Sequence, residues 1–292
     1  MRLAAIDIGS NAARLLITEV TNGEKNDPVF NKLNLVRVPL RLGFDVFKYG
    51  EIPKQKIGMI LQTMKAFKHL TNAYEVKHIM ACATSAMRDA KNTPDIIRKV
   101  KLETDIAIEV ISGDTEAGLI FENHIAETLD KDHSYMYIDV GGGSTELSFF
   151  SNGVLNFKES FNIGTIRLLQ EAVHEKTWEV MKEIIKTVTK GQKEVMAIGS
   201  GGNINKIFSM SKRKDGKPIS LDLLRDYYKE LSSVDLEERM KLYNLKPDRA
   251  DVIVPALLIY INAMRWAGAT EIYVPRIGLV DGLVHHMWEE MK

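Results

Sequence analysis

The sequence carries one pattern twice: an apolar strand that ends in a single aspartate, a turn of small residues, and a second apolar strand. The first copy spans residues 3–17 and contains Asp7, and the second spans residues 135–150 and contains Asp139. Read alone, each copy could be an ordinary β-hairpin with glycine at its bend. Because the pattern occurs twice, we interpret the chain as a duplicated fold in which each half begins with the same hairpin.

Each turn is suited to holding a phosphate. Glycine has no Cβ and permits positive φ, so successive backbone N–H groups can converge on an anion. We therefore expect phosphate to be bound by Gly9, Ser10 and Asn11 in the first copy and by Gly141, Gly142, Gly143 and Ser144 in the second.

The aspartate of each copy cannot bind that phosphate directly. Mg²⁺ is typically held by one or two carboxylates together with waters and substrate oxygens. The sequence therefore predicts that Asp7 and Asp139 are metal ligands and that Mg²⁺ lies between them and the phosphate.

A duplicated half that offers one aspartate and one small-residue turn resembles the actin-like ATPase superfamily. This resemblance implies an α/β fold of two ribonuclease H-like domains with a cleft between them, which close on a phosphate and its metal. We expect residues 1–125 to form the first domain and residues 126–277 the second, with a C-terminal helix at 278–292 that crosses back to the first. The length of 292 residues and the 45% apolar content are ample for two cores.

Hydrophobic periodicity predicts alternating strands and helices in both halves. Besides the two hairpins, strands are expected at 29–33, 36–40, 76–83, 106–111, 154–161, 195–198 and 271–274. Helices are expected at 56–70, 84–89, 93–100, 115–129, 166–172, 178–190, 203–210, 221–231, 236–243, 249–267 and 278–291. Pro255 is expected to kink or shorten the helix that contains it, because proline removes a helical hydrogen bond.

Composition excludes several classes of function. The 39 Lys and Arg residues balance 39 Asp and Glu residues, which gives no sign of a nucleic-acid or membrane surface. The single cysteine, Cys82, lies in an apolar strand and is expected to be a reduced core thiol. No apolar run approaches about 20 residues, and Met1 leads directly into a strand, so a cytoplasmic protein is expected.

Five sequence blocks identify a narrower resemblance. In order, they are IDIGSN at 6–11, ACATSAMRDAKN at 81–92, ISGDTEAGLIF at 111–121, IDVGGGSTEL at 138–147 and SFNIGTIRLL at 160–169. The same order of blocks occurs in the exopolyphosphatase/guanosine pentaphosphate phosphohydrolase family, which this chain resembles.

The family resemblance implies hydrolysis of a terminal phosphoanhydride with Mg²⁺. The substrate would be inorganic polyphosphate or, with the same chemistry, guanosine pentaphosphate, and the sequence hardly separates the two. A kinase of the superfamily and a non-catalytic binding module are the alternatives from other classes. Larger family members carry a further C-terminal helical domain, which we expect to be absent, so long polyphosphate would be held by surface basic residues or by a homodimer.

Three charged residues are candidates for catalysis. The resemblance matches Glu116 to the family's catalytic glutamate, which would orient or deprotonate water, although a glutamate in a first helical turn also simply complements the helix dipole. Arg88, a few residues after a strand end, is the candidate guanidinium, and a surface salt bridge with Asp89 is the alternative. Glu146 is the second acid, and it could bind a metal-bound water or be the reserve base.

A further anion-binding element is expected where a short strand runs into residues 199–202 and then a helix. Gly201 and Gly202 would offer backbone N–H groups at a helix N-terminus. The family more often has a Gly-Gly-Thr type sequence here, so this difference puts substrate preference in doubt. The basic loop at 212–217 is expected to be a solvated connection that could also recruit an anion.

Overall fold

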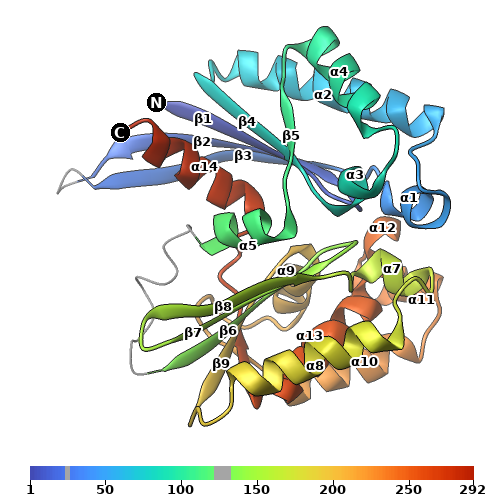
Figure 1. Cartoon of the computed structure of the whole chain (residues 1–292), viewed down its shortest axis with the longest axis vertical. Coiled ribbons are helices and arrows are strands. Elements are labelled where there is room, and N and C mark those ends of the chain that lie inside the picture. The colour runs from blue at the N-terminus through green and yellow to red at the C-terminus, as the bar shows by residue number, and fades with distance from the viewer. Residues whose placement is uncertain (24–26, 122–132) are drawn as a thin grey trace. The chain divides into compact units, whose positions relative to one another are not determined.

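The computed structural model describes residues 1–23, 27–121 and 133–292, and these form two compact α/β units (Figure 1). Unit 1 comprises Met1–Asn123 and Leu279–Lys292, and unit 2 comprises His124–Gly278. Each unit has its own mixed sheet and its own hydrophobic core. The predicted α/β class with two mixed sheets is therefore confirmed, while the residue predicted to end the first domain, at position 125, lies outside the described residues.

The sheet of unit 1 has five strands in the order β3-β2-β1-β4-β5. They are β1 (Arg2–Ile8), β2 (Ala13–Asn22), β3 (Pro28–Val38), β4 (His78–Ala83) and β5 (Ile108–Val110). Strands β1, β4 and β5 run parallel, and β2 and β3 run antiparallel as hairpin partners. The carboxyl ends of the parallel strands therefore meet at one edge of the sheet, where ligands bind in open α/β sheets.

Helices cover both faces of this sheet. They are α1 (Gly43–Tyr49), α2 (Lys54–Ala73), α3 (Ser85–Asp89), α4 (Thr93–Thr104), α5 (Gly113–Phe121) and α14 (Leu279–Glu290). In Figure 1, α2 and α4 lie on one face and α14 on the other. Side chains alternate along a strand, so Ala4, Ile6 and Ile8 of β1 join the core beneath α2, and Asp7 points to the opposite face.

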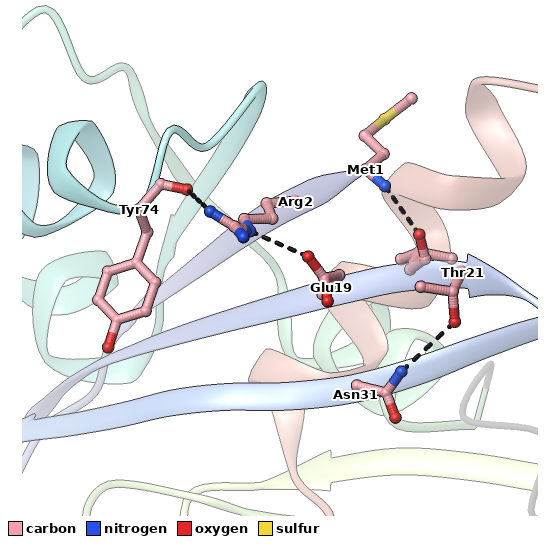
Figure 2. A network of polar contacts seen from close by, with 7 residues as sticks. Met1, Arg2, Glu19, Thr21, Asn31 and Tyr74 are labelled. Atoms are coloured by element: carbon pink, nitrogen blue, oxygen red, sulfur yellow. Dashed lines mark hydrogen bonds and ion pairs between the residues drawn. The ribbon is translucent and has the colours of Figure 1, made fainter.

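Polar contacts secure the end of the sheet remote from Asp7 (Figure 2). The Met1 amino group donates to the carbonyl of Val20 at 2.8 Å, and Arg2 donates from Nε to Glu19 at 3.1 Å. A second nitrogen of Arg2 donates to the carbonyl of Tyr74 at 3.1 Å. These bonds fix the start of β1 against its neighbours and so help to set the register that brings Asp7 to the other end.

The sheet of unit 2 has six strands in the order β10-β11-β9-β6-β7-β8. They are β6 (Ser134–Val140), β7 (Thr145–Ser151), β8 (Val154–Phe161), β9 (Val195–Ser200), β10 (Ile219–Ser220) and β11 (Glu271–Tyr273). Strands β6, β9 and β11 run parallel. Strand β7 pairs antiparallel with β6 and with β8. The order β8-β7-β6-β9-β11 repeats β3-β2-β1-β4-β5 of unit 1.

The helices of unit 2 pack around α13. They are α7 (Thr165–Leu169), α8 (Glu175–Val188), α9 (Gly202–Met210), α10 (Leu221–Ser232), α11 (Leu236–Tyr243), α12 (Pro247–Ala250) and α13 (Ile253–Ala267). Helix α13 contacts β6, α8 and α10, and its buried residues, including Leu257, Tyr260 and Met264, belong to the core of the unit. By length and composition, residues Pro247–Ala267 could also cross a membrane, but 56% of that window is buried, and core helices meet the same criteria.

Several expected elements differ in the structure. Helix α1 and the short β10 were not expected, and the two segments at 29–33 and 36–40 form the single strand β3. The predicted helix at 249–267 is divided into α12 and α13, so Pro255 falls in the first turn of α13, where its missing N–H costs no intrahelical bond. Helix α5 begins at Gly113, and the predicted extension to 129 lies outside the described residues.

Candidate functional site

In unit 2, strand register places a row of polar side chains across four strands. Asp139 of β6 pairs with Glu146 of β7 and with Ser200 of β9, and Glu146 pairs with Ser160 of β8. Paired residues lie on the same face of a sheet, with Cβ atoms of an antiparallel pair about 4.5–5.5 Å apart. The row therefore sets two carboxyl groups opposite each other at the carboxyl end of β6.

Glu146 is the more buried of the two acids, with 3% of its surface exposed. Its Oε1 accepts a hydrogen bond of 2.7 Å from the Ser160 hydroxyl. Like charges directly across two strands destabilise a sheet unless a cation or a proton lies between them. The pair of Asp139 and Glu146 is thus chemically suited to a bound cation.

The equivalent row of unit 1 has different chemistry. Asp7 of β1 pairs in register with Arg14 of β2 and with Cys82 of β4. Asp7 is 3% exposed, and its Oδ2 accepts from Arg14 at 3.1 Å, while its buried Oδ1 has no hydrogen-bond partner among the described residues. Burial raises the pKa of Asp7, and Arg14 opposes that rise. Asp7 therefore has one oxygen neutralised by the protein and one oxygen left for a ligand.

The turn after β1 is held by the chain segment that precedes α1. The carbonyl of Ser10 accepts from the N–H of Gly43, and that of Asn11 accepts from the N–H of Arg41, both at 2.8 Å. In a planar trans peptide the N–H points in the direction opposite to the C=O. Because the carbonyls of Ser10 and Asn11 point toward residues 41–43, the N–H groups of Asn11 and Ala12 point away from that segment. Ser10 is fixed further by a bond of 2.8 Å between its hydroxyl and that of Ser85.

The turn after β6 is held in the same manner by the start of α7. The carbonyls of Gly141 and Gly142 accept from the N–H groups of Thr165 at 3.1 Å and Ile166 at 2.8 Å, and the carbonyl of Gly143 accepts from Nε of Arg167 at 2.7 Å. By the same peptide geometry, the N–H groups that point away from α7 are those of Gly142, Gly143 and Ser144. These three donors match three of the four residues predicted for this turn.

Gly9 and Gly141 have a role other than the predicted one. The N–H of Gly9 donates to the carbonyl of Ala12 at 3.1 Å, and the N–H of Gly141 donates to the carbonyl of Ser144 at 2.9 Å. Both N–H groups therefore close their turns rather than facing a phosphate. A Cβ would come within 3.3 Å of Ala12 at Gly9 and within 3.2 Å of Ser144 at Gly141.

The reasoning from positive φ was wrong for these turns, because none of their described glycines has positive φ. The need for small residues comes instead from close backbone packing. A Cβ on Gly164 would lie 2.4 Å from the carbonyl carbon of Gly143 and 2.5 Å from the carbonyl oxygen of Gly142. Gly164 and Arg167 thus support the second turn, and Ala12 contributes to the first, although none of them was a predicted site residue.

Arg88 and Glu116 lie in neighbouring parts of unit 1. Nη1 of Arg88 donates to the carbonyl of Ile111 at 2.8 Å, directly before Ser112, whose hydroxyl accepts from the N–H of Thr115 at the start of α5. Glu116 follows in the first turn of α5 and is 9% exposed. Arg88 therefore ties α3 to the segment that carries Glu116.

Cys82 shows that Asp7 and Glu116 are close to one point in unit 1. Burial raises the pKa of the Cys82 thiol well above its usual value, and the negative charges of Asp7 and Glu116 raise it further. Cys82 is free and buried, which confirms the expected core thiol.

The predicted anion element at the start of α9 lies beside Asp139. Gly201 has φ of +105°, and a Cβ there would lie 3.0 Å from Oδ1 of Asp139. Gly202 begins α9. The buried Tyr260 hydroxyl donates to the carbonyl of Ser200, which fixes the backbone before the helix. Here positive φ does require glycine, as the sequence suggested for such turns.

Protein groups alone do not form a complete metal cage. Within the described ranges, no group of three or more His, Cys, Asp or Glu side chains could hold an ion. Mg²⁺ characteristically needs only one or two carboxylates, since waters and substrate oxygens complete its shell. In unit 2, the opposed acids Asp139 and Glu146 are oxygen donors of the kind that this ion prefers, and in unit 1 the buried Oδ1 of Asp7 is another.

A separate cavity of about 550 Å³ lies in unit 1 at the amino end of β4. It is lined by His78, Met80, Glu109, Met287 and Glu290, among others. None of the predicted site residues lines it, so we do not assign it to the candidate site.

Comparisons with known proteins agree with these features. Residues 16–290 match the family described as the Ppx/GppA phosphatase family. The bifunctional 3-dehydroquinate synthase/phosphatase of Fusobacterium nucleatum is 29% identical over 304 residues, which cover 93% of this chain but only 44% of that protein. Exopolyphosphatase 1 of Mycobacterium tuberculosis is 24% identical over 304 residues, covering 97% of this chain and 87% of its own.

A solved structure extends the similarity to the whole fold. The crystal structure of an exopolyphosphatase from Cytophaga hutchinsonii has a TM-score of 0.86 and 26% identity. It covers 100% of this chain, which in turn covers 99% of that protein. The fold of the whole chain therefore occurs in a solved structure of a similar protein.

Proposed function

The chain belongs to the Ppx/GppA phosphatase family, and from that membership we propose that it releases the terminal phosphate of inorganic polyphosphate by hydrolysis. The single observation that carries the proposal is the pairing of Asp139 with Glu146 across β6 and β7, beside a turn that directs three N–H groups to one side. Such a site suits a ligand that brings both a cation and dense negative charge. Polyphosphate with its metal is a ligand of this kind.

We propose that Asp139 and Glu146 of unit 2 hold Mg²⁺, and that Asp7 of unit 1 is a metal ligand as well. When bound, the ion would neutralise phosphate charge and support in-line displacement. The support from the protein is the buried, opposed carboxyl pair and the ligand-ready oxygen of Asp7.

The terminal phosphate is proposed to bind to the N–H groups of Gly142, Gly143 and Ser144. Preorganised N–H donors stabilise charge that develops on phosphate oxygens without reorganisation during the reaction. Ser10 and Asn11 of the first turn, and Gly201 and Gly202 at the start of α9, are proposed as further phosphate contacts.

Glu116 is proposed to orient the attacking water and to accept its proton at a carboxylate oxygen. Burial favours this role, because a buried carboxylate is a stronger base than an exposed one. Arg88 is proposed to hold the segment before Glu116 and to offer its remaining guanidinium donors to phosphate. Glu146 remains the second candidate for the base.

Guanosine pentaphosphate is the alternative substrate, since its 5′ end presents the same phosphoanhydride. The start of α9, where Gly201 has positive φ, is proposed to contact either the nucleotide or a distal phosphate. A cytoplasmic location is also proposed, because the single cysteine of the chain is buried and reduced.

The test compares phosphate release from medium-chain polyphosphate, guanosine pentaphosphate and ATP, each with Mg²⁺ and with EDTA. We expect fastest release from polyphosphate and none with EDTA. Faster release from guanosine pentaphosphate would favour the alternative. Phosphate transfer from ATP to an added acceptor, without release to water, would favour a kinase and contradict the proposal.

A further inference from the structure

The backbone of a glycine turn can present either N–H groups or carbonyl oxygens to a ligand. A carbonyl oxygen carries partial negative charge and would repel a phosphate, so the orientation of each peptide decides whether the turn binds an anion. Glycine peptides reorient easily, since glycine is the least restricted residue. The turn at 141–144 therefore needs something that fixes its peptides.

In this chain the carbonyls of Gly141, Gly142 and Gly143 each have a donor in residues 165–167. Two of the donors are backbone N–H groups, of Thr165 and Ile166, and they hold Gly141 and Gly142. The third carbonyl, that of Gly143, is held by a side chain: Nε of Arg167, at 2.7 Å. The peptide between Gly143 and Ser144 is thus the one whose orientation depends on a residue that mutation can change.

We propose that Arg167 is a positioning residue that keeps the peptide between Gly143 and Ser144 oriented with its carbonyl away from the phosphate and its N–H toward it. A bond from a guanidinium to a carbonyl is charge-assisted and therefore stronger than a bond between neutral groups. Gly164 completes the arrangement, because a side chain there would collide with the same turn. The inference rests on the proposed phosphate-binding function of the turn.

The first turn offers an internal comparison. The carbonyls of Ser10 and Asn11, which correspond to those of Gly142 and Gly143, are both held by backbone N–H groups, of Gly43 and Arg41. The role that a side chain has in unit 2 is thus filled by the main chain in unit 1. The dependence on a single arginine side chain is expected for the second turn alone.

The experiment measures binding of inorganic phosphate to Arg167→Met by calorimetry, without turnover. Arg239→Met is the matched control, because Nε of Arg239 likewise donates to a backbone carbonyl in unit 2, that of Leu231 at 2.6 Å, away from the turn. We expect phosphate affinity to fall about 10- to 100-fold in Arg167→Met, the range for a lost hydrogen bond to a charged group. We expect Arg239→Met to lose thermal stability but keep its phosphate affinity.

A second readout is chemical rescue. Millimolar guanidinium should restore phosphate binding to Arg167→Ala but have no such effect on the wild type. Wild-type phosphate affinity in a folded Arg167→Met, or equal losses of affinity in the two methionine variants, would overturn the proposal. If Arg167→Met does not fold, Arg167→Lys replaces it: about tenfold weaker binding is expected, and unchanged binding would overturn the proposal.

The outcome stays separate from the test of the proposed function. If the wild type binds phosphate but releases none from polyphosphate, the hydrolase proposal fails. The experiment on Arg167 then still shows whether this residue positions the turn for phosphate binding. If the wild type binds no phosphate, the inference on Arg167 fails, and phosphate release from polyphosphate still decides the hydrolase proposal.

Discussion

The two units repeat one strand order but place different charges at the same position of the sheet. In unit 1, Asp7 lies opposite Arg14, a cation that the protein itself provides. In unit 2, Asp139 lies opposite Glu146, a second anion. The difference teaches that one strand order can carry different charges: unit 1 sets an arginine opposite its aspartate, whereas unit 2 sets a second acid there, as the proposed metal site would need.

The largest expected effect comes from Asp139→Asn. Because the variant removes one of the two opposed acids, we expect phosphate release from polyphosphate to fall about 10³–10⁵-fold, the range for losing a key charge in phosphoryl transfer. Asp7→Asn should lose less, since Arg14 already offsets part of the charge of Asp7. Steady-state rates over a range of Mg²⁺ concentrations check both variants. Equal losses in the two would break the comparison between the units.

Glu116→Gln is expected to have the next largest effect. If Glu116 orients the water, turnover at saturating substrate should fall about 10²–10⁴-fold, while the concentration of Mg²⁺ for half-maximal activity stays unchanged. A melting curve is the control, because a glutamate that only complements the helix dipole would change stability by about 0.3–1 kcal/mol and leave the rate intact. Normal turnover would contradict the assignment, and Glu146 would then be the base to test.

Gly164→Ala should destabilise the second turn more than Gly9→Ala destabilises the first. Its Cβ would meet the backbone of Gly142 and Gly143 at 2.5 Å or less, so we expect a loss of about 1–3 kcal/mol in the free energy of unfolding, together with weaker phosphate binding. Gly9→Ala should cost less, because its nearest contact is 3.3 Å. Urea unfolding of both variants measures the difference. Gly58→Ala is the control, since nothing lies within 4 Å of its Cβ on helix α2, and it should be slightly stabilising.

The smallest expected effect is the change that Mg²⁺ makes to the stability of Ser160→Ala. The variant removes the 2.7 Å hydrogen bond to Glu146, and such a bond to a charged group contributes about 1.5–3 kcal/mol. We expect lower stability in EDTA and a smaller loss with Mg²⁺ present, because the ion would restrain the same carboxylate. Thermal unfolding in the two buffers checks this. A loss that is independent of Mg²⁺ would argue against Glu146 as a metal ligand.

The two pairs of charged residues could be predicted from the sequence, because each pair lies within one hairpin whose strands follow each other in the chain. A hairpin with a short loop fixes its register, and only residues 141–144 separate β6 from β7, so the pairing of Asp139 with Glu146 follows from the sequence between them. The pairing of Asp7 with Arg14 follows in the same way and could have been found from the alternation along β2. Fold class was accessible for the same reason, since each half alternates strands and helices.

Contacts between segments that are distant in the sequence could not be predicted from it. Nothing in the local pattern around Gly164 indicates that its backbone touches Gly142 and Gly143, and nothing around Arg167 indicates that it holds a turn carbonyl. The continuous strand β3 was also missed, because Leu33 is an extra residue in the pairing with β2: Ile17 pairs with Asn34, and Thr18 pairs with Lys32. Such a bulge interrupts the alternation on which the sequence reasoning depended.

Cys82 gives the protein an intrinsic reporter of local opening. It is the sole cysteine of the chain, it lies in the central region of the unit 1 sheet, and burial together with neighbouring acids keeps its thiol protonated. A thiol reagent can therefore react only when β4 is transiently exposed, so the labelling rate measures the opening of unit 1 separately from unit 2. A ligand that slows the labelling stabilises unit 1, and this effect can be measured without following catalysis.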